Sequence, residues 1–303
     1  MEQGKIVLTG TSGFVGQNLL HFLKNDYSSE TLNRKELQSI SIDAIDNYSS
    51  VIHLAGKAHD LKKTFNPNEY YHVNFELTKK LYNAFLTSNA KRFIFISSVK
   101  AVADEVDQIL TEEVKPDPKT DYGKSKFMAE QYIQNHPLPE GKSYYVLRPC
   151  MIHGPGNKGN LNLLYQLVKK GIPYPLAGFQ NKRSYLSVEN LCFVIKELIS
   201  RDDITSGIYN VADDEALSTN EVVSILSKSI NMKPRLWKIS PRLVTFFAKV
   251  GDRLHLPLTT ERLVKLTESY VVSNAKIKAA INKKLPVKAA EGLQITASSF
   301  SKA

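Results

Sequence analysis

The sequence predicts an α/β fold, with a doubly wound parallel sheet and a smaller C-terminal subdomain. Over the first half of the 303-residue chain, short apolar runs alternate with amphipathic segments of helical period. Glycines at positions 10, 13 and 16 separate the first apolar run from the first amphipathic segment. The chain is 42% hydrophobic, enough for a sizeable core, and it lacks any run of about 18 uncharged apolar residues that would span a membrane.

The first half predicts strands and helices in strict alternation. Strands are expected at 5–9, 29–33, 50–54, 92–97 and 143–148, and helices at 14–25, 68–88 and 121–135. Strands that are separated by helices pair in parallel, with the helices on both faces of the sheet. The stretch from 33 to 50 is short for a further complete βαβ unit, so we expect the sheet to lack such a unit there.

A glycine- and proline-rich segment at 154–160 breaks this alternation and indicates a crossing into a second part of the chain. Beyond it we expect a helix at 161–170, a strand at 206–212 that returns to the sheet, and a helix at 218–230. The remaining C-terminal residues are expected to be helical and basic.

The glycines between the first strand and helix have the spacing of a Rossmann-type dinucleotide site. Gly10 allows a tight turn, Gly13 lets the backbone approach a pyrophosphate, and Gly16 lets the helix pack closely on the strand. The helix N-terminus supplies N–H groups and the positive end of a dipole. This pattern predicts binding of NAD or NADP, although a glycine triplet also occurs in ordinary βα turns.

Hydroxyl and amine side chains follow in the order that a catalytic site needs. The strand predicted at 92–97 is followed by Ser98, at the sheet edge where ligands bind in open parallel sheets. The helix predicted at 121–135 begins with Tyr122 and Lys126, which are four residues apart and project from one face. The same spacing in Tyr165 and Lys169 is interpreted as part of a packing helix, because no serine-bearing strand end precedes it.

The residue types of this trio suit hydride transfer at a sugar or alcohol carbon, which needs a base or an acid for the hydroxyl proton. A free tyrosine has a pKa near 10, too high for a base at neutral pH. The Lys126 ammonium and a positive nicotinamide ring are expected to favour the Tyr122 phenolate and to lower this pKa. Lys126 is also expected to hold the cofactor ribose, and Ser98 to orient the substrate oxygen.

These residues resemble the extended short-chain dehydrogenase/reductase superfamily, in its branch of nucleotide-sugar epimerases and dehydratases. The resemblance covers nearly the whole chain, and its further stretches are 53–56, 73–74, 147–149, 153–156, 181–191 and 273–276. It implies that the cofactor is bound by Gly10, Gly13, Phe14, Val15, Gly16, Arg34, Leu54, Ala55, Gly56, Asn74, Tyr122, Lys126 and Pro149. It implies that the substrate is bound by Ser98, Tyr122, Asn160, Leu161, Leu176, Arg183 and Tyr270.

The resemblance implies hydride chemistry at C4 of a nucleotide-diphosphate sugar. The first expectation is a 4-epimerase of a UDP-hexose or UDP-N-acetylhexosamine in surface-polysaccharide biosynthesis. An NADPH-dependent 4-keto reductase of a UDP-deoxy-amino sugar uses the same trio and stays open, as does a non-catalytic NAD(P)-binding sensor. A 4,6-dehydratase is disfavoured, because Val99 and Lys100 stand where that activity needs an acidic pair after Ser98.

The end of the second strand bears on the choice of cofactor. An acidic residue there would bind the ribose hydroxyls of NAD, whereas this chain has Arg34. An arginine accommodates the 2′-phosphate of NADP, so Arg34 favours NADP, unless its side chain is simply solvated.

The resemblance also sets the expected domains. Residues 1–155 are expected to form the NAD(P)-binding domain, joined by a returning segment around 184–215. Residues 156–183 and 216–303 are expected to form the nucleotide-sugar-binding subdomain. A homodimer through the two long helices of the first half is the usual assembly in the family.

The net charge of +10 lies entirely in the last quarter, where residues 231–303 hold 14 basic and 4 acidic side chains. Such an excess favours an anionic substrate or membrane surface, or else is a solvated face that aids solubility. Nucleic acid is not expected as a partner, because aromatic residues do not interleave with the basic ones. The two cysteines lack disulfide or metal-ligand spacing, so we expect a reduced, cytoplasmic protein without a metal site.

An amphipathic segment at 241–256 lies within this basic quarter. Its apolar residues recur at helical spacing and are Leu243, Phe246, Phe247, Val250 and Leu254. Packing of this face against the substrate-binding subdomain is the first expectation. Weak association with a membrane surface is the alternative, since arginine and lysine flank the apolar residues.

Overall fold

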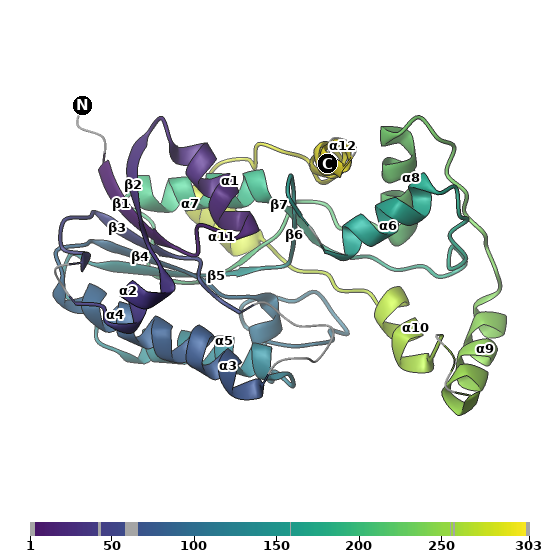
Figure 1. Cartoon of the computed structure of the whole chain (residues 1–303), viewed down its shortest axis with the longest axis horizontal. Coiled ribbons are helices and arrows are strands. Elements are labelled where there is room, and N and C mark those ends of the chain that lie inside the picture. The colour runs from purple at the N-terminus through teal and green to yellow at the C-terminus, as the bar shows by residue number, and fades with distance from the viewer. Residues whose placement is uncertain are drawn as a thin grey trace.

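The computed structural model describes residues 4–41, 44–57, 66–157, 159–254, 256 and 258–300. Within them, parallel strands form a main sheet in the order β2-β1-β3-β4-β5-β8 (Figure 1). These strands are β1 (Gly4–Thr9), β2 (Tyr27–Leu32), β3 (Ser50–His53), β4 (Arg92–Ile96), β5 (Ser143–Pro149) and β8 (Gly207–Val211). The predicted doubly wound parallel sheet is confirmed.

The strand order reverses between β1 and β3. In open α/β sheets, such a reversal opens a crevice at the carboxyl ends of the two strands, where ligands bind. The glycine turn follows β1 at this place. Among the described residues, the connection from β2 to β3 contains only a short helix, α2 (Arg34–Gln38). Strand β2 is therefore the edge strand, and the sheet lacks a further complete βαβ unit there, as expected.

Helices cover both faces of the sheet (Figure 1). One face carries α1 (Phe14–Leu23), α7 (Val188–Ser200) and α11 (Ala275–Ile281), and the other carries α2, α4 (Leu77–Thr87) and α5 (Asp121–Asn135). Strand residues alternate between these layers: Ile94 and Ile96 pack into the first, Phe93 and Phe95 into the second. Each such side chain contributes about 1.5–3 kcal/mol by its burial.

The helix predicted at 68–88 is three segments in the structure. They are α3 (Pro67–Tyr71), a π-helical stretch (His72–Glu76) and α4. A π-helical turn holds an extra residue, and such turns occur frequently at functional sites. Asn74 lies within this turn, which no periodic pattern in the sequence revealed.

The second part of the chain packs around its own apolar cluster. Its elements are β6 (Met151–His153), α6 (Asn160–Lys169), β7 (Tyr185–Ser187), α8 (Thr219–Ser229), α9 (Pro241–Leu254), α10 (Thr260–Thr267) and α12 (Ala289–Phe300). Strands β6 and β7 form a small parallel pair. Helices α6, α8 and α12 pack together, whereas α9 and α10 extend away at the lower right of Figure 1. Among the described residues, no helix is both long and apolar enough to cross a bilayer.

Several element bounds differ from those predicted, and local capping explains the clearest case. The second strand ends at Leu32, one residue early, because Asn33 caps α2. The Asn33 side chain accepts from the Glu36 backbone N–H, while the Glu36 carboxylate accepts from the Asn33 N–H, which forms a capping box. The sequence contains this signal, but it was not recognised within so short a connection.

Candidate active site

The turn between β1 and α1 requires its glycines. Gly10 has a φ of +72°, a left-handed conformation that glycine adopts without strain. A Cβ atom at Gly10 would lie 2.6 Å from the backbone nitrogen of Ala55, so only glycine lets these two loops come so close. A Cβ atom at Gly16 would lie 2.5 Å from the Gly10 carbonyl oxygen, which explains the tight junction of α1 with the turn.

The N-terminus of α1 is suited to an anion. Gly13 is its N-cap residue, and the described chain supplies no side-chain cap there. The Gly13 N–H donates to the Gly10 carbonyl at 3.1 Å and closes the turn. N–H groups of the first helical turn have no acceptor within the helix, and they lie at the positive end of its dipole. The residues present therefore fit the pyrophosphate of a dinucleotide.

The loop after β3 (residues 54–57) lies against the glycine turn and is held by Asn74. The Asn74 Oδ1 accepts from the Lys57 N–H at 2.7 Å, and its Nδ2 donates to the Lys57 carbonyl at 3.2 Å. The same Nδ2 donates to Ser125 Oγ at 3.0 Å. Asn74 is fully buried, so it joins this loop firmly to α5.

A buried histidine holds the same loop from within the sheet. His53 Nδ1 lies 2.7 Å from Thr9 Oγ1, and its Nε2 lies 2.9 Å from Thr78 Oγ1. The Thr78 hydroxyl donates to the Asn74 carbonyl, so its oxygen accepts from the Nε2–H of His53. The Thr9 hydroxyl then donates to His53 Nδ1 and accepts from the Ala55 N–H at 3.1 Å. Burial lowers the pKa of His53 to about 3, so this network stays neutral.

Sequence reasoning missed Thr9 and Thr78 in this network. Each contributes a single hydroxyl from a regular strand or helix, and neither belongs to a recognisable motif. Only the pairing of β1 with β3 and the packing of α4 bring them to the histidine.

The Ser98 hydroxyl lies close enough to the Tyr122 phenol to act on its pKa as a hydrogen-bond partner. Ser98 follows β4 and caps the 3₁₀ turn Val99–Ala101. Tyr122 lies in the first turn of α5, where Thr120 caps the helix by accepting from the Gly123 N–H at 3.2 Å. Burial raises the pKa of Tyr122 above its ordinary value, and the hydrogen bond with Ser98 acts in the opposite direction. The chain's own groups therefore move this pKa upward, against the lowering expected from the sequence, because burial of the phenol outweighs the opposing contact.

Lys126 lies one helical turn beyond Tyr122 and is buried. Its Nζ donates to the Ile96 carbonyl at 2.8 Å, and burial lowers the pKa of Lys126 to about 8. A Cβ atom at Gly56 would lie 3.0 Å from this Nζ, so the amine is beside the loop that packs on the glycine turn. The structure thus brings Ser98, Tyr122 and Lys126 together next to that turn.

Gly123 lets α5 begin close to the serine loop. A Cβ atom there would overlap the Lys100 carbonyl oxygen and would lie 2.9 Å from the Pro118 Cβ. The glycine directly after Tyr122 is therefore a packing requirement of the site, although the sequence alone showed it only as a member of a motif.

A buried ion pair between β5 and α5, which sequence reasoning missed, supports this trio. Arg148 on β5 contacts the Glu130 carboxylate of α5 through three nitrogen–oxygen pairs, at 3.0, 3.1 and 2.5 Å. Ser97, next to Ser98, donates its hydroxyl to the same carboxylate. Glu130 is fully buried and Arg148 nearly so. The pair therefore ties the serine loop, the helix that carries Tyr122, and the neighbouring strand.

Arg183 and Tyr270 form a short β-bridge on the side of the second subdomain. The Tyr270 hydroxyl donates to the Ala103 carbonyl at 2.7 Å, which brings it to the loop that follows Ser98. Arg183 donates through Nε to the Glu268 carbonyl at 3.1 Å, and its Nη2 lies 3.2 Å from the Glu268 carboxylate. The arginine expected to bind the diphosphate is therefore paired with an acidic residue that sequence reasoning missed.

Lys100 adds a second cation to this region. Its Nζ lies 4.5 Å from the centroid of the Tyr270 ring and donates to the Asp104 carbonyl at 2.6 Å. Burial lowers the pKa of Lys100, and both Glu268 and Arg183 are close enough to affect it. Lys100 and Arg183 therefore lie between the serine loop and the second subdomain together with acidic groups, among them Glu268.

The other residues expected to bind the cofactor lie around the same crevice. Phe14 and Val15 form the first turn of α1, and they pack with Leu54 on the main core. Pro149 ends β5 and is buried. Arg34 is exposed at the start of α2, directly after the carboxyl end of β2.

Three residues expected to bind the substrate lie within the second subdomain. Asn160 is exposed at the start of α6. Leu161 and Leu176 are buried and pack in the apolar cluster of that subdomain. Tyr165 is fully buried in the same cluster, as expected of a packing helix. Among the described residues, no group of histidine, cysteine or acidic side chains could hold a metal ion.

Comparison with known proteins places this chain in a family. A family model described as "NAD dependent epimerase/dehydratase family" matches residues 6–212. A UDP-glucose 4-epimerase from Vibrio cholerae is 31% identical, over 98% of this chain and 96% of the relative. An N-acetyl-alpha-D-glucosaminyl-diphospho-ditrans,octacis-undecaprenol 4-epimerase from Escherichia coli O157:H7 is 27% identical, over 75% of this chain and 73% of that protein.

The fold is also that of solved structures. MoeE5 in complex with UDP-glucose and NAD superposes with a TM-score of 0.77 and 21% identity, and 99% of each chain is covered. The family match over more than half of the chain and the full-length relative agree with the resemblance that the sequence indicated. This chain belongs to the NAD-dependent epimerase/dehydratase family.

Proposed function

We propose that this chain is a nucleotide-sugar 4-epimerase that acts on a UDP-hexose or UDP-N-acetylhexosamine in surface-polysaccharide biosynthesis. The observation that carries the proposal is the meeting of Ser98, Tyr122 and Lys126 beside the glycine turn. The Vibrio cholerae relative supports chemistry at C4 of a UDP-sugar, and the Escherichia coli relative, named for a sugar on a lipid diphosphate, supports the polysaccharide role.

In this proposal each residue acts on the sugar or holds the cofactor. Ser98 holds the C4 oxygen, and Tyr122, close to Ser98, removes and returns the hydroxyl proton. Lys126 holds the cofactor ribose, while Gly10, Gly13 and Gly16 accommodate the pyrophosphate. A bound oxidised nicotinamide supplies a hydride acceptor and a positive charge. Arg183 and Lys100 attract the substrate diphosphate.

The raised pKa of Tyr122 favours its role as a proton donor over its role as a base. As a proton donor to a keto sugar, the neutral phenol is ready at neutral pH. As a base toward the sugar hydroxyl, it needs positive charge nearby to stabilise the phenolate. The buried Lys126 ammonium, one turn along the same helix, is the chain's own source of that charge.

The released cofactor tests the proposal most directly. An epimerase returns the hydride that it removes, so the purified protein should release stoichiometric NAD when heated. It should also interconvert UDP-glucose or UDP-N-acetylglucosamine with the C4 epimer, without added cofactor. A protein that holds no dinucleotide, takes up NADPH and consumes it with a UDP-4-keto sugar contradicts the epimerase.

The alternative is an NADPH-dependent 4-keto reductase, which the position of Arg34 favours. Arg34 follows the strand next to β1 and is exposed, so it can meet a 2′-phosphate. If this holds, Arg34→Ala should weaken NADP binding about tenfold or more, the loss of one charge-assisted contact, and should leave NAD binding unchanged. Calorimetric titration of both dinucleotides, with the neighbouring Lys35→Ala as a control, measures this. Equal losses for NAD and NADP would contradict a role in phosphate recognition.

The lowered pKa of Lys126 predicts a limit on cofactor binding at alkaline pH. Below about pH 8 the amine carries its charge, and above it the charge is lost. Affinity for the dinucleotide should therefore fall as pH rises through about 8. Fluorescence titration from pH 6.5 to 9.5 should show this inflection in the native protein. A Lys126→Arg variant that binds should lack it, since arginine stays protonated, and an inflection that persists in the variant would exclude Lys126 as its origin.

We also propose a homodimer through the two long helices α4 and α5, which lie together on one face of the sheet (Figure 1). Met128 on α5 is an exposed apolar residue of this face. Light scattering on the purified protein decides the point, since a monomer would contradict it.

A further inference from the structure

Helices α9 and α10 form a hairpin that is held together by specific contacts. Val244, Ala248 and Gly251 are the buried residues of α9, at helical spacing, and Leu263 is that of α10. A Cβ atom at Gly251 would overlap the Leu258 carbonyl oxygen, so glycine is required where the chain returns. Specific packing contacts therefore define the structure of this hairpin.

A cap also joins the two helices of this hairpin. The carboxylate of Asp252, near the end of α9, accepts from the Thr260 N–H at 2.9 Å and from the Thr260 hydroxyl. An acidic residue of α9 is thus used at the N-terminus of α10, where negative charge is favourable.

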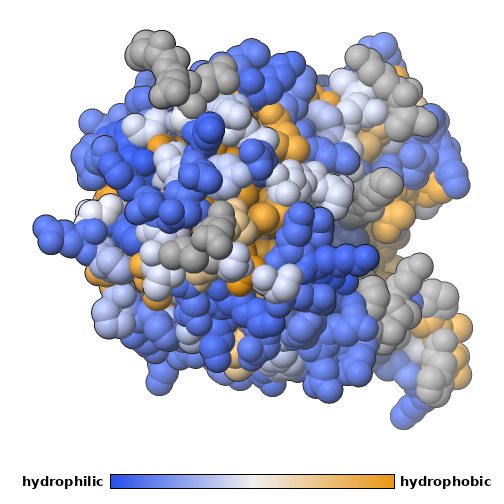
Figure 2. Space-filling view, turned by 60° about the vertical axis from the view of Figure 1, so that its left-hand side comes forward, coloured by the Kyte–Doolittle hydropathy of each residue, from blue (hydrophilic) through white to orange (hydrophobic). Residues whose placement is uncertain are grey.

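The outer face of the hairpin exposes large apolar side chains. Leu243, Phe246, Phe247 and Leu254 on α9 expose between 48% and 62% of their surface. The neighbouring Leu256, Val264 and Leu266 are also exposed. Figure 2 shows this hydrophobic surface at its lower right edge. The expectation that the apolar residues of 241–256 pack against the substrate-binding subdomain is therefore wrong for most of them, because α9 uses a different face for packing.

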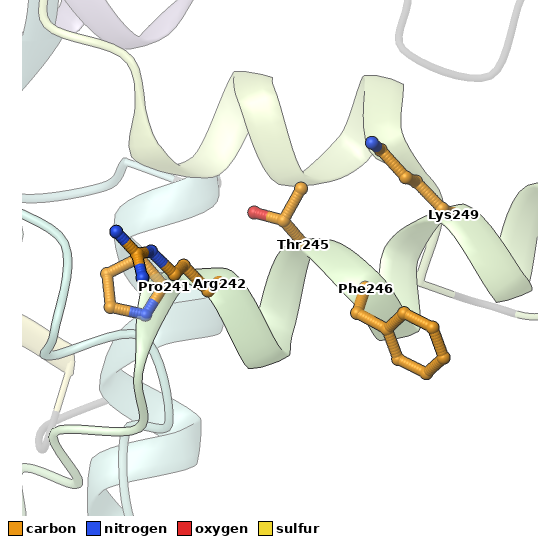
Figure 3. Close-up of a pocket in the computed structure, with 5 residues that line it drawn as sticks. All are labelled: Pro241, Arg242, Thr245, Phe246 and Lys249. Carbon is orange, nitrogen blue, oxygen red and sulfur yellow. The ribbon is translucent and has the colours of Figure 1, made fainter.

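Basic side chains run along the apolar face. Arg242, Lys249 and Arg253 are spaced by seven and four residues, so they form a stripe on α9 beside the phenylalanines. Figure 3 shows Arg242, Phe246 and Lys249 lining a surface pocket, and all of its described lining residues belong to α9. Lys249 and Phe246 are three residues apart and so start from the same side of α9, and their side chains diverge in that view.

We propose that the α9–α10 hairpin rests on the surface of an anionic lipid bilayer. Its phenylalanines and leucines would enter the boundary between headgroups and acyl chains, and its arginines and lysine would meet the lipid phosphates. Exposed aromatic residues next to a basic stripe complement such a surface in both polarity and charge. At 14 residues, α9 is too short to span a bilayer, so it lies in the interface.

The hairpin is connected to the proposed substrate site. Glu268 is the C-cap residue of α10 and pairs with Arg183, which also donates to the Lys265 carbonyl within α10. Docking of the hairpin would therefore place this arginine close to the lipid headgroups. The membrane contact itself does not depend on the proposed reaction, since none of the catalytic trio lies in the hairpin.

Co-sedimentation with vesicles tests the proposal. The native protein should pellet with vesicles that contain anionic phosphatidylglycerol, and should stay in the supernatant with phosphatidylcholine alone. Phe246→Ser/Phe247→Ser should lower the partition coefficient about tenfold or more through lost apolar burial. Lys249→Glu/Arg253→Glu should lower it at least as much, because each basic residue contributes separately near an anionic surface.

Matched controls distinguish docking of the hairpin from nonspecific hydrophobic adsorption and from misfolding. Leu163→Ser removes an apolar side chain that is 69% exposed on α6, and it should pellet like the native protein. All variants should keep the native circular dichroism spectrum and activity on a nucleotide sugar.

Three outcomes would overturn the proposal. They are a native protein that remains soluble with both kinds of vesicle, one that binds both kinds equally, and hairpin variants that still pellet. A fourth is a native dimer in light scattering that the phenylalanine variants convert to a monomer, since this face would then join two copies of the chain.

Discussion

Replacing Tyr122 with phenylalanine is expected to lower the rate of C4 epimerisation by about 10²–10⁴-fold, the usual contribution of a general acid–base group. The hydroxyl lies close enough to Ser98 to be affected by it, and Lys126 is one helical turn further along α5. Phenylalanine keeps the ring and its packing, so the variant should fold normally and still bind the dinucleotide. The steady-state rate on a UDP-sugar, with dinucleotide affinity measured beside it, tests this.

The chain contains a matched control for this substitution. Tyr165 also has a lysine four residues later, but it is fully buried in the second subdomain. Among the described residues its hydroxyl has no hydrogen-bond partner, so Tyr165→Phe removes no interaction. Its rate should equal that of the native protein. A Tyr122→Phe variant that is as active as the native protein would exclude the phenol as the proton-transfer group. It would support the alternative that the chain is a non-catalytic NAD(P)-binding sensor.

The parallel sheet and the trio could be predicted because their signals are local in the sequence. Buried strands such as 93–96 are continuous apolar runs, and the glycine turn is read from the spacing of three glycines directly after the first strand. The order of Ser98, Tyr122 and Lys126 along the chain follows from the position of strand ends in an open sheet. These features need no knowledge of which distant segments meet.

The residues that were missed depend on contacts between distant segments. Glu268 reaches Arg183 across 85 positions, and Thr78 reaches His53 from a helix on one face of the sheet. Neither is part of a motif or a periodic pattern. Strands β6 and β7 are three residues each, too short for an alternating pattern, so their pairing could be seen only in the structure.

The direction of the Tyr122 pKa shows a similar limit. The residue types suggested lowering by a nearby ammonium together with a positive nicotinamide ring, whereas among the chain's own groups burial of the ring, which the sequence does not display, raises the pKa. For the face of α9, the apolar spacing correctly predicted an amphipathic helix. The spacing could not show that Val244, Ala248 and Gly251, on another side, do the packing.

The second large effect is expected at the buried ion pair of Glu130 and Arg148. Arg148→Met should lower the free energy of unfolding by about 3–5 kcal/mol, because it leaves a buried carboxylate without its cation. Of its partners in the described part of the chain, the carboxylate would keep the hydroxyl of Ser97. Urea denaturation followed by circular dichroism measures the loss. Lys119→Met, which breaks an exposed ion pair with Asp117, should cost less than about 1 kcal/mol.

The double variant Glu130→Leu/Arg148→Met separates charge from packing. Without either charge, no ion is left buried and unpaired, so most of the lost stability should return. A double variant as unstable as Arg148→Met would show that the native packing around these side chains, and not the unpaired charge, accounts for the loss.

The same double variant tests whether Glu130 also acts on the site. Glu130 lies one turn beyond Lys126 on α5, and its negative charge raises the pKa of that lysine against the lowering by burial. Removing the carboxylate should therefore move the alkaline limit of dinucleotide binding to a pH below about 8. A purely structural ion pair would leave that limit where it is once stability is restored. The position of the inflection therefore distinguishes a support of the fold from a group that keeps Lys126 charged at working pH.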